Sequence, residues 1–183
     1  MKKIARFILH IAGWKIKDNY PPYTKSVCVM APHTSMWDFV WGKLYFMSMG
    51  IKPRFLIKKE MFRGLTGPLL KKLGGIPVDR GKAGNTVSDI VRTIKAKDSF
   101  LLVITPEGTR KKVEKWKTGA LRIAVAADIP VVAGRMDYKK KELGVVSIYE
   151  HLPDDKAFIN QLKSDFAAVS GKHPEKFNPY AKQ

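Results

Sequence analysis

The chain has 183 residues, which suggests one domain with a hydrophobic core of its own. Its 34 lysine and arginine residues against 16 aspartate and glutamate residues give a net charge of +18, which favours an anionic partner over a merely solvated basic surface. Nucleic acid, an anionic membrane and a phosphate-bearing substrate are the candidates. A single cysteine excludes an internal disulfide framework and is consistent with a reducing compartment. No run of about 20 apolar residues predicts a membrane-spanning helix.

The first segment, residues 1–17, has the pattern of a basic amphipathic helix. This pattern suits a membrane interface, and packing on the protein's own core is the alternative. A signal peptide is disfavoured because Arg6 interrupts the apolar stretch and no small-residue cleavage site follows. The remaining residues, 18–183, are expected to form one domain. The apolar face of the segment has helical spacing and comprises Ile4, Phe7, Ile8 and Ile11, extended by Trp14.

A histidine and a carboxylate stand at the turn that follows the first predicted strand. Residues 26–31 form an apolar run typical of a buried strand, and residues 36–49 have a helical pattern. His33 and Asp38 lie between and just inside these elements, where α/β proteins often place their chemistry. A histidine oriented by a carboxylate is a general base. Cys28, within the strand, is interpreted as a small buried hydrophobic residue rather than a nucleophile.

The spacing of the pair restricts how it can meet. Five residues correspond to about 140° on a regular helix, so His33 must precede the helix if it is to contact Asp38. Ser35 and Asp38 fit a capping box, with Ser35 as N-cap and Asp38 at the third helical position. Asp38 would then point back toward the turn. The spacing alone leaves open that Asp38 only caps the helix and that His33 is an exposed loop residue.

Two later segments carry side chains suited to an anionic substrate. A short strand over residues 76–78 delivers Arg80 to the sheet edge, where its planar guanidinium suits phosphate, although an ion pair with Asp79 is the alternative. Lys117 stands where a predicted helix over residues 118–127 begins, and the N–H groups there could hold an anion or be ordinarily capped.

The turn over residues 105–110 follows the most apolar predicted strand, residues 100–104. Its proline and glycine predict a tight turn at the carboxyl end of that strand. Glu107, Thr109 and Arg110 would project into the crevice there. A surface turn with a Glu107–Arg110 ion pair is the alternative.

Apolar runs alternate with helical patterns along the chain, which predicts an α/β fold: one domain with a mixed, largely parallel sheet flanked by helices. Lysines at 139–141 predict the turn of a late antiparallel hairpin. The other predicted strands are 54–57, 129–133 and 143–149, and the other predicted helices are 60–73 (interrupted by glycine and proline), 86–97 and 154–169.

Four blocks in a fixed order resemble the glycerolipid acyltransferases typified by 1-acylglycerol-3-phosphate acyltransferase. The resemblance covers about residues 27–133, over half of the chain. Many members have asparagine before the histidine, where this chain has Pro32, and an aromatic residue where it has Thr105. These departures affect local packing more than the reacting groups. The blocks are His33–Asp38 (His-x-x-x-x-Asp), Gly75–Arg80 (Gly-x-x-x-x-Arg), Pro106–Thr109 followed by Arg110 (Pro-Glu-Gly-Thr), and Ile129–Val132 (Ile-Pro-Val).

The resemblance implies transfer of a fatty acyl group from acyl-coenzyme A or acyl-acyl carrier protein to the hydroxyl of a lysophospholipid. The first acceptor to expect is 1-acylglycerol-3-phosphate, in phospholipid biosynthesis, and an amino-acid-based lyso-lipid is an alternative. The resemblance implies no metal or other cofactor, and a peripheral position on the cytoplasmic face of the cell membrane. It implies catalysis by His33 and Asp38, and substrate binding by Arg80, Glu107, Gly108, Thr109, Arg110 and Lys117.

Two rival functions fit the residues less well. A basic membrane or nucleic-acid adaptor on the same scaffold would explain the charge but would leave the His33, Arg80 and Glu107 blocks without a purpose, and no recognised nucleic-acid module is present. Nucleic acid is therefore not an expected partner. Phosphoryl transfer is disfavoured because the Gly-x-x-x-x-Gly-Lys-Ser/Thr pattern is absent from the sequence, as is a convincing set of metal carboxylates. Zinc-ligand spacing is absent too.

Overall fold

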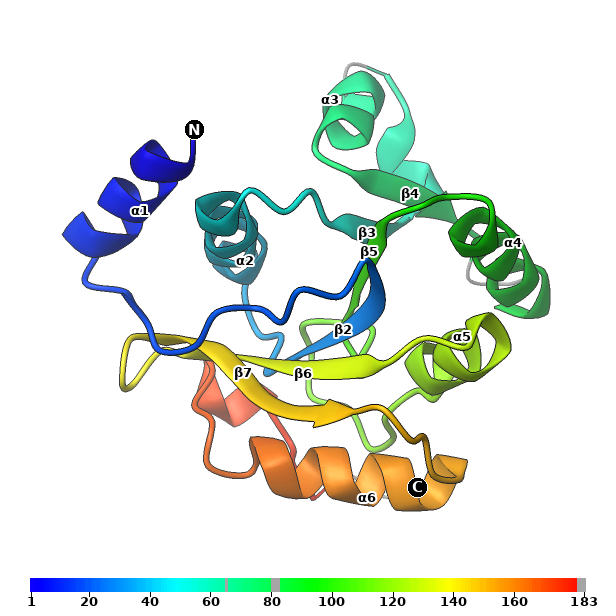
Figure 1. The fold of residues 1–183 in the computed structure, drawn as a ribbon. Helices are drawn as coiled ribbons and strands as arrows, with labels where there is room; N and C mark the ends of the chain where they lie inside the picture. Colours follow the sequence, from blue (N-terminus) through cyan, green and yellow to red (C-terminus); the bar gives the residue numbers. More distant parts are fainter. Residues whose placement is uncertain (65, 80–82, 181–183) are drawn as a thin grey trace.

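A seven-stranded sheet lies between two layers of helices in the computed structural model, which describes residues 1–64, 66–79 and 83–180 (Figure 1). The strand order is β1-β7-β6-β2-β5-β3-β4, and every neighbouring pair is parallel except the β6–β7 hairpin. The strands are β1 (Lys15–Ile16), β2 (Lys25–Ala31), β3 (Arg54–Lys58), β4 (Gly75–Val78), β5 (Phe100–Ile104), β6 (Val131–Asp137) and β7 (Glu142–Tyr149).

Helices cover both faces of the sheet. The helices are α1 (Lys2–Ile11), α2 (Trp37–Met49), α3 (Thr66–Lys72), α4 (Ala83–Lys95), α5 (Gly119–Ala127) and α6 (Asp155–Phe166), with short 3-10 helices η1 (Lys59–Phe62) and η2 (Pro174–Lys176). One buried cluster joins β2, β5 and β6 to α4, α5 and α6, and the other joins the same strands to α1 and α2. The arrangement confirms the predicted α/β class, the largely parallel sheet and the late hairpin.

The central strands follow directly from the sequence. β2 pairs in parallel with both β5 and β6, and its residues from Ser26 to Ala31 are buried. A strand with helices on both faces has no solvent-facing side, so its sequence is a continuous apolar run rather than an alternation of apolar and polar residues. Because parallel strands end at one edge, the segments after β2, β4 and β5 emerge together at the carboxyl edge of the sheet.

The differences from the sequence prediction that change an element are the following, while other bounds, such as those of α4 and α6, shift by up to three residues. The interrupted helical pattern over residues 60–73 is divided into η1 and α3. The amino-terminal helix ends at Ile11, and residues 15–16 of the predicted 1–17 segment form β1, which pairs with β7. β6 begins at Val131 and continues to Asp137, four residues beyond its predicted end, because the hairpin partner β7 supplies hydrogen bonds along its whole length.

Helix α1 lies beside α2 (Figure 1). Its exposed side carries a stripe of apolar side chains. Ala5 and Leu9 are buried, whereas Phe7 is 64% exposed. Trp14 is buried and follows the end of the helix, so it does not extend the apolar face of α1 as the sequence pattern predicted. The helix has ended before it, and Gly13 turns the chain with a φ of +77°. Among the described residues, no helix has the length and apolarity needed to cross a bilayer.

Candidate active site

His33 and Asp38 meet at the carboxyl edge of the sheet. His33 follows β2, and Asp38 lies in the first turn of α2. His33 Nδ1 lies 3.2 Å from Asp38 Oδ2, and the side chains are 23% and 7% exposed respectively. With Nδ1–H donated to the carboxylate, the Nε2 atom of His33 carries the free lone pair. The pair thus has the arrangement of an oriented general base.

Asp38 is surrounded by hydrogen-bond donors. Its Oδ2 accepts from the backbone N–H groups of Thr34 and Ser35, each at 2.8 Å, and its Oδ1 accepts from the hydroxyl of Tyr138 at 2.6 Å. Burial opposes ionisation, but the hydrogen bonds from His33, Tyr138 and Ser35 outweigh it and lower the pKa of Asp38. Asp38 is therefore an anion that fixes the imidazole at neutral pH.

The predicted capping box is formed in a modified way. Asp38 accepts from the backbone N–H of Ser35 as predicted, but the Ser35 hydroxyl accepts from Trp37 N, at 3.2 Å, rather than from Asp38 N. The helix accordingly begins at Trp37, with Met36 at the N-cap position. The geometry confirms that a cap and a His–Asp pair coexist, because His33 lies in the turn that precedes the helix.

Glu107 lies against the backbone of His33. The backbone N–H of His33 donates to Glu107 Oε1 at 2.9 Å, and the Glu107 residue is 4% exposed. Burial raises the pKa of Glu107 to about 7. Its other oxygen, Oε2, is buried and has no hydrogen-bond partner within the described part of the chain. Glu107 thus points into the turn that carries His33 and keeps one acceptor atom unused.

The rest of the 105–110 turn is more exposed. Thr109 is half-buried and Arg110 is exposed, and in the described structure no ion pair joins Glu107 to Arg110. Gly108 has a φ of +64°, a conformation that favours glycine. The Lys117 side chain passes over Gly108, so that a Cβ there would lie 3.0 Å from Lys117 Nζ. The backbone N–H of Lys117 donates to Pro106 O at 2.8 Å, which holds these two segments together.

Two further predicted residues have different outcomes. Arg80 falls outside the described residues, although β4, which precedes it, ends at the same sheet edge as β2 and β5. Cys28 is fully buried, and burial raises its pKa to about 12, which agrees with its interpretation as a core residue. Across the described residues, no group of three or more His, Cys, Asp or Glu side chains is arranged to hold a metal ion.

Two contributions to the site were missed in the sequence. Tyr138, just after β6, binds Asp38 although 100 residues separate them. Residues 171–173 pack against the turn that carries His33: Gly171 lies against Thr34, and the backbone N–H of His173 donates to Thr34 Oγ1 at 3.2 Å. The sequence carried no signal for Tyr138, because the strand predicted over residues 129–133 ends before it and β6 continues to Asp137. The carboxyl-terminal segment carries no pattern that marks it either.

Comparisons with known proteins show the family of this chain and a similar fold. Residues 14–136 match a family model described as Acyltransferase. Among solved structures, the chain is similar to the 1-acyl-sn-glycerophosphate (LPA) acyltransferase PlsC from Thermotoga maritima, with a TM-score of 0.57 and 17% sequence identity. That match covers 92% of this chain and 74% of the other, and at this identity it supports the fold alone. A search of curated protein sequences found no significant match.

Proposed function

Because the chain belongs to the acyltransferase family, we propose that it transfers a fatty acyl group from a thioester to the hydroxyl of a lysophospholipid, with 1-acylglycerol-3-phosphate as the first acceptor to test. The observation that carries this proposal is the His33–Asp38 contact of 3.2 Å at the carboxyl edge of the sheet. The donor is acyl-coenzyme A or acyl-acyl carrier protein. An amino-acid-based lyso-lipid is the alternative acceptor.

The reaction begins with a proton transfer at His33. Nε2 removes the proton of the acceptor hydroxyl while the hydroxyl oxygen forms a bond to the thioester carbonyl carbon. The carbonyl π electrons move to its oxygen, and a tetrahedral intermediate results. Asp38 stabilises the imidazolium that forms, because its carboxylate already faces Nδ1.

The intermediate then collapses. The carbonyl double bond re-forms, the carbon–sulfur bond breaks, and the thiolate takes the proton from Nε2 of His33. The products are an ester and a free thiol, and His33 returns to its neutral state. No covalent intermediate on the enzyme is required, so the burial of Cys28 is compatible with the reaction.

Glu107 holds the base and shapes the acceptor site in this proposal. Its Oε1 accepts a hydrogen bond from the backbone N–H of His33, which fixes the turn that carries the base. Gly108 and Thr109 would shape the acceptor site beside it. The positive residues proposed to bind phosphate on the acceptor or the donor are Arg80, Arg110 and Lys117.

We further propose that the protein works as a peripheral enzyme on the anionic, cytoplasmic face of the cell membrane. Helix α1 exposes a stripe of apolar side chains. Further apolar side chains are exposed at the start of α2, next to His33. Lys172 lies over the exposed Trp37 ring, with Nζ 5.2 Å from the ring centroid. The lipid-facing side chains in this proposal are Ile4, Phe7, Ile8, Ile11, Met36, Trp37 and Val40.

The decisive experiment is an acyl-transfer assay with identified products. The purified protein is incubated with acyl-coenzyme A or acyl-acyl carrier protein and a panel of lyso-lipids, and the products are identified by mass. We expect the diacyl product of 1-acylglycerol-3-phosphate, and a loss of turnover of at least about 10²-fold in His33→Ala. Equal turnover by a folded His33→Ala protein would refute the mechanism.

Other outcomes separate the rival functions. Acylation of an amino-acid-based lyso-lipid alone would replace the proposed acceptor but keep the reaction class. No product from any acceptor, combined with steeply salt-dependent binding of nucleic acid, would favour the basic adaptor instead.

A further inference from the structure

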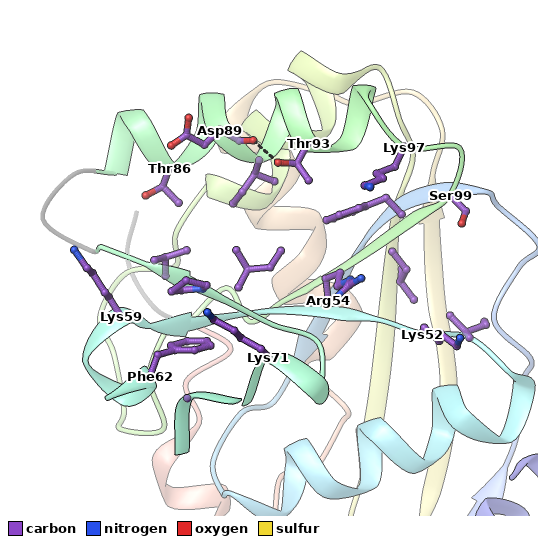
Figure 2. Close-up of a pocket in the computed structure, with 18 of the residues that line it drawn as sticks. Lys52, Arg54, Lys59, Phe62, Lys71, Thr86, Asp89, Thr93, Lys97 and Ser99 are labelled. Atoms are coloured by element: carbon purple, nitrogen blue, oxygen red, sulfur yellow. Dashed lines mark hydrogen bonds between the residues drawn. The ribbon is translucent and has the colours of Figure 1, made fainter. Parts of the chain in front are cut away.

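A large concavity lies away from the His33–Asp38 pair. It occupies about 1660 Å³ between α4, the outer strands β3 and β4, and the segment from η1 to α3 (Figure 2). His33, Asp38 and Glu107 do not line it. Its volume exceeds the roughly 300–1,000 Å³ of sites for drug-sized ligands, so it has room for a larger, elongated molecule. We refer to it as the α4 groove.

Positive side chains dominate the walls of the α4 groove. Among the lining residues, three are carboxylates, and one of these, Asp89, is bound by Arg92 at 2.7 Å. The six positive residues form no ion pair with a carboxylate of the described residues. The described lining of the groove therefore carries an excess of positive over negative side chains. These six residues are Lys52, Arg54, Lys59, Arg63, Lys71 and Lys97.

The surroundings of Lys43 indicate the same excess of positive charge. Its ammonium group is half-buried near β3 and donates to Leu73 O at 2.8 Å. Burial and the nearby guanidinium of Arg54 both lower the pKa of Lys43. Two like charges without a carboxylate partner in the described structure create a positive potential, and a bound anion would relieve their repulsion.

The groove is apolar where it is not positive. Ile76 and Val78 of β4 form part of its floor, and Phe62 and Ile90 contribute from the two walls. Lys71 and Phe62 lie on one side of the groove, and α4 with Lys97 just beyond it lies on the other (Figure 2). Inorganic phosphate would leave this apolar floor uncovered. A ligand with a flat ring and several phosphates matches both parts of the lining.

The position of the groove relates it to the active site. Its lining extends from Lys52 and Ser99, which precede β3 and β5 at the amino edge of the sheet, to Val78 and Asp79, where β4 ends at the carboxyl edge. β4 is separated from β2 by β3 and β5, so three inter-strand spacings, about 15 Å in all, separate it from the strand that leads to His33. A flexible thioester arm of moderate length can cross this distance.

We propose that the α4 groove binds the phosphorylated adenosine diphosphate portion of coenzyme A, so that the pantetheine arm crosses the carboxyl ends of β3 and β5 and presents its thioester at His33. This inference rests on the proposed acyl transfer and assigns its donor. It distinguishes coenzyme A from an acyl carrier protein, since the carrier protein lacks the nucleotide that a concave groove of this lining would recognise.

Two pairs of neighbouring lysines provide matched variants. Lys71 lines the groove and Lys72 does not, and both are near the surface at the end of α3. Lys97 lines the groove, whereas Lys95 lies against a separate depression between α4 and α5. Binding of coenzyme A, without acceptor, is measured by calorimetry for Lys71→Ala/Lys97→Ala and for Lys72→Ala/Lys95→Ala. We expect the first double variant to weaken Kd by about tenfold or more and the second to change it by less than about twofold.

The outcomes separate this inference from the proposed function. The groove assignment would be supported if 3′-dephospho-coenzyme A bound more weakly than coenzyme A and if only Lys71→Ala/Lys97→Ala lost affinity for coenzyme A. This support would hold even if no acyl transfer were detected. Equal affinities of the two double variants would overturn the groove assignment while leaving a measured transferase activity intact. Binding of holo-acyl carrier protein with no binding of coenzyme A would overturn it as well.

Discussion

The hydroxyl of Tyr138 donates a 2.6 Å hydrogen bond to Asp38 Oδ1, the oxygen that does not face His33. Tyr138 is itself held from two other directions. Its backbone N–H donates to Ser170 O at 2.8 Å, and its ring packs edge-on against Trp14 at a centroid distance of 5.0 Å. Tyr138 therefore connects the carboxylate of Asp38 to both the amino-terminal and the carboxyl-terminal segments.

Tyr138→Phe tests whether this contact positions the proposed catalytic pair, His33 and Asp38. The phenyl ring keeps the packing against Trp14, but Asp38 loses one of the hydrogen bonds that lower its pKa against the effect of burial. We expect kcat to fall about tenfold with little change in KM, because a hydrogen bond to a charged group is lost without loss of a substrate contact. The acid limb of the kcat profile should move to higher pH, since a more basic carboxylate holds the imidazolium more tightly.

The matched control is Tyr180→Phe, at a tyrosine that is 82% exposed. It should leave kcat, KM and the pH profile unchanged. A Tyr138→Phe protein with a lower melting temperature and an unshifted pH profile would show that Tyr138 has only a structural role.

Glu107 predicts a pH dependence of stability. Its pKa in the folded protein is raised from 4.5 to about 7, so the folded state binds the proton more tightly than the unfolded state. The contribution of Glu107 to the free energy of unfolding should therefore be highest below pH 4.5 and should be lost as the pH rises through 7. Glu107→Gln removes the ionisation. We expect Glu107→Gln to exceed the wild type in free energy of unfolding by roughly 2–3 kcal/mol at pH 8 and by little at pH 4.

Urea unfolding at the two pH values measures this difference. Glu114→Gln, at an exposed carboxylate in the same connection, is the control and should show no pH-dependent gain. A stability difference between Glu107→Gln and the wild type that is the same at both pH values would contradict the burial argument. Acyl-transfer activity of Glu107→Gln is measured separately from its stability. The amide oxygen of the glutamine side chain would still accept a hydrogen bond from the backbone N–H of His33.

The central fold was predictable because burial on two faces leaves a direct mark on the sequence. β5 has the bounds 100–104 that its apolar run predicts, and the lysines at 139–141 mark the hairpin turn between β6 and β7. β1 was not predictable, since its two residues have no pattern of their own and gain their conformation by pairing with β7. The burial of Trp14 depends on contacts with Trp41 and Tyr138, which no local period encodes.

The candidate site was predictable only where its residues are close in sequence. The capping pattern of Ser35 and Asp38 required His33 to precede the helix, and the structure confirms that arrangement. The orientation of Glu107 toward the His33 backbone was not predictable, because it depends on how the turn after β5 folds against the turn after β2. Tyr138 was missed for the same reason, since it reaches Asp38 only through the pairing of β6 with β2.

Gly108→Ala tests the contact between the turn and Lys117. Alanine at a φ of +64° costs about 1 kcal/mol, and its methyl group would lie 3.0 Å from Lys117 Nζ, so the lysine must move. We expect a raised KM for the phosphorylated substrate and a small loss of stability. Gly64→Ala is the control, with a φ of +62° and no atom within 4 Å of the new methyl group. It should lose similar stability without a change in KM. Equal KM values for the two variants would remove Lys117 from the substrate site.

Helix α1 provides the last prediction, which concerns membrane binding. Phe7 is 64% exposed on the outer stripe of α1, whereas Leu9 is buried against the protein, so Phe7→Ser should remove lipid contact without disturbing the core. Burying one large apolar side chain is worth about 1.5–3 kcal/mol, and its loss should lower the partition coefficient onto vesicles with anionic lipid at least about tenfold.

Flotation with such vesicles measures the bound fraction. Val125→Ser is the matched control, because Val125 is 58% exposed on α5, a helix that covers the other face of the sheet from α1. It should float as the wild type does. If Phe7→Ser also floats like the wild type, α1 is not the main membrane contact, and the lysines and arginines that give the chain its charge of +18 would carry the binding instead. A loss of flotation at high salt in that case would identify the electrostatic contribution.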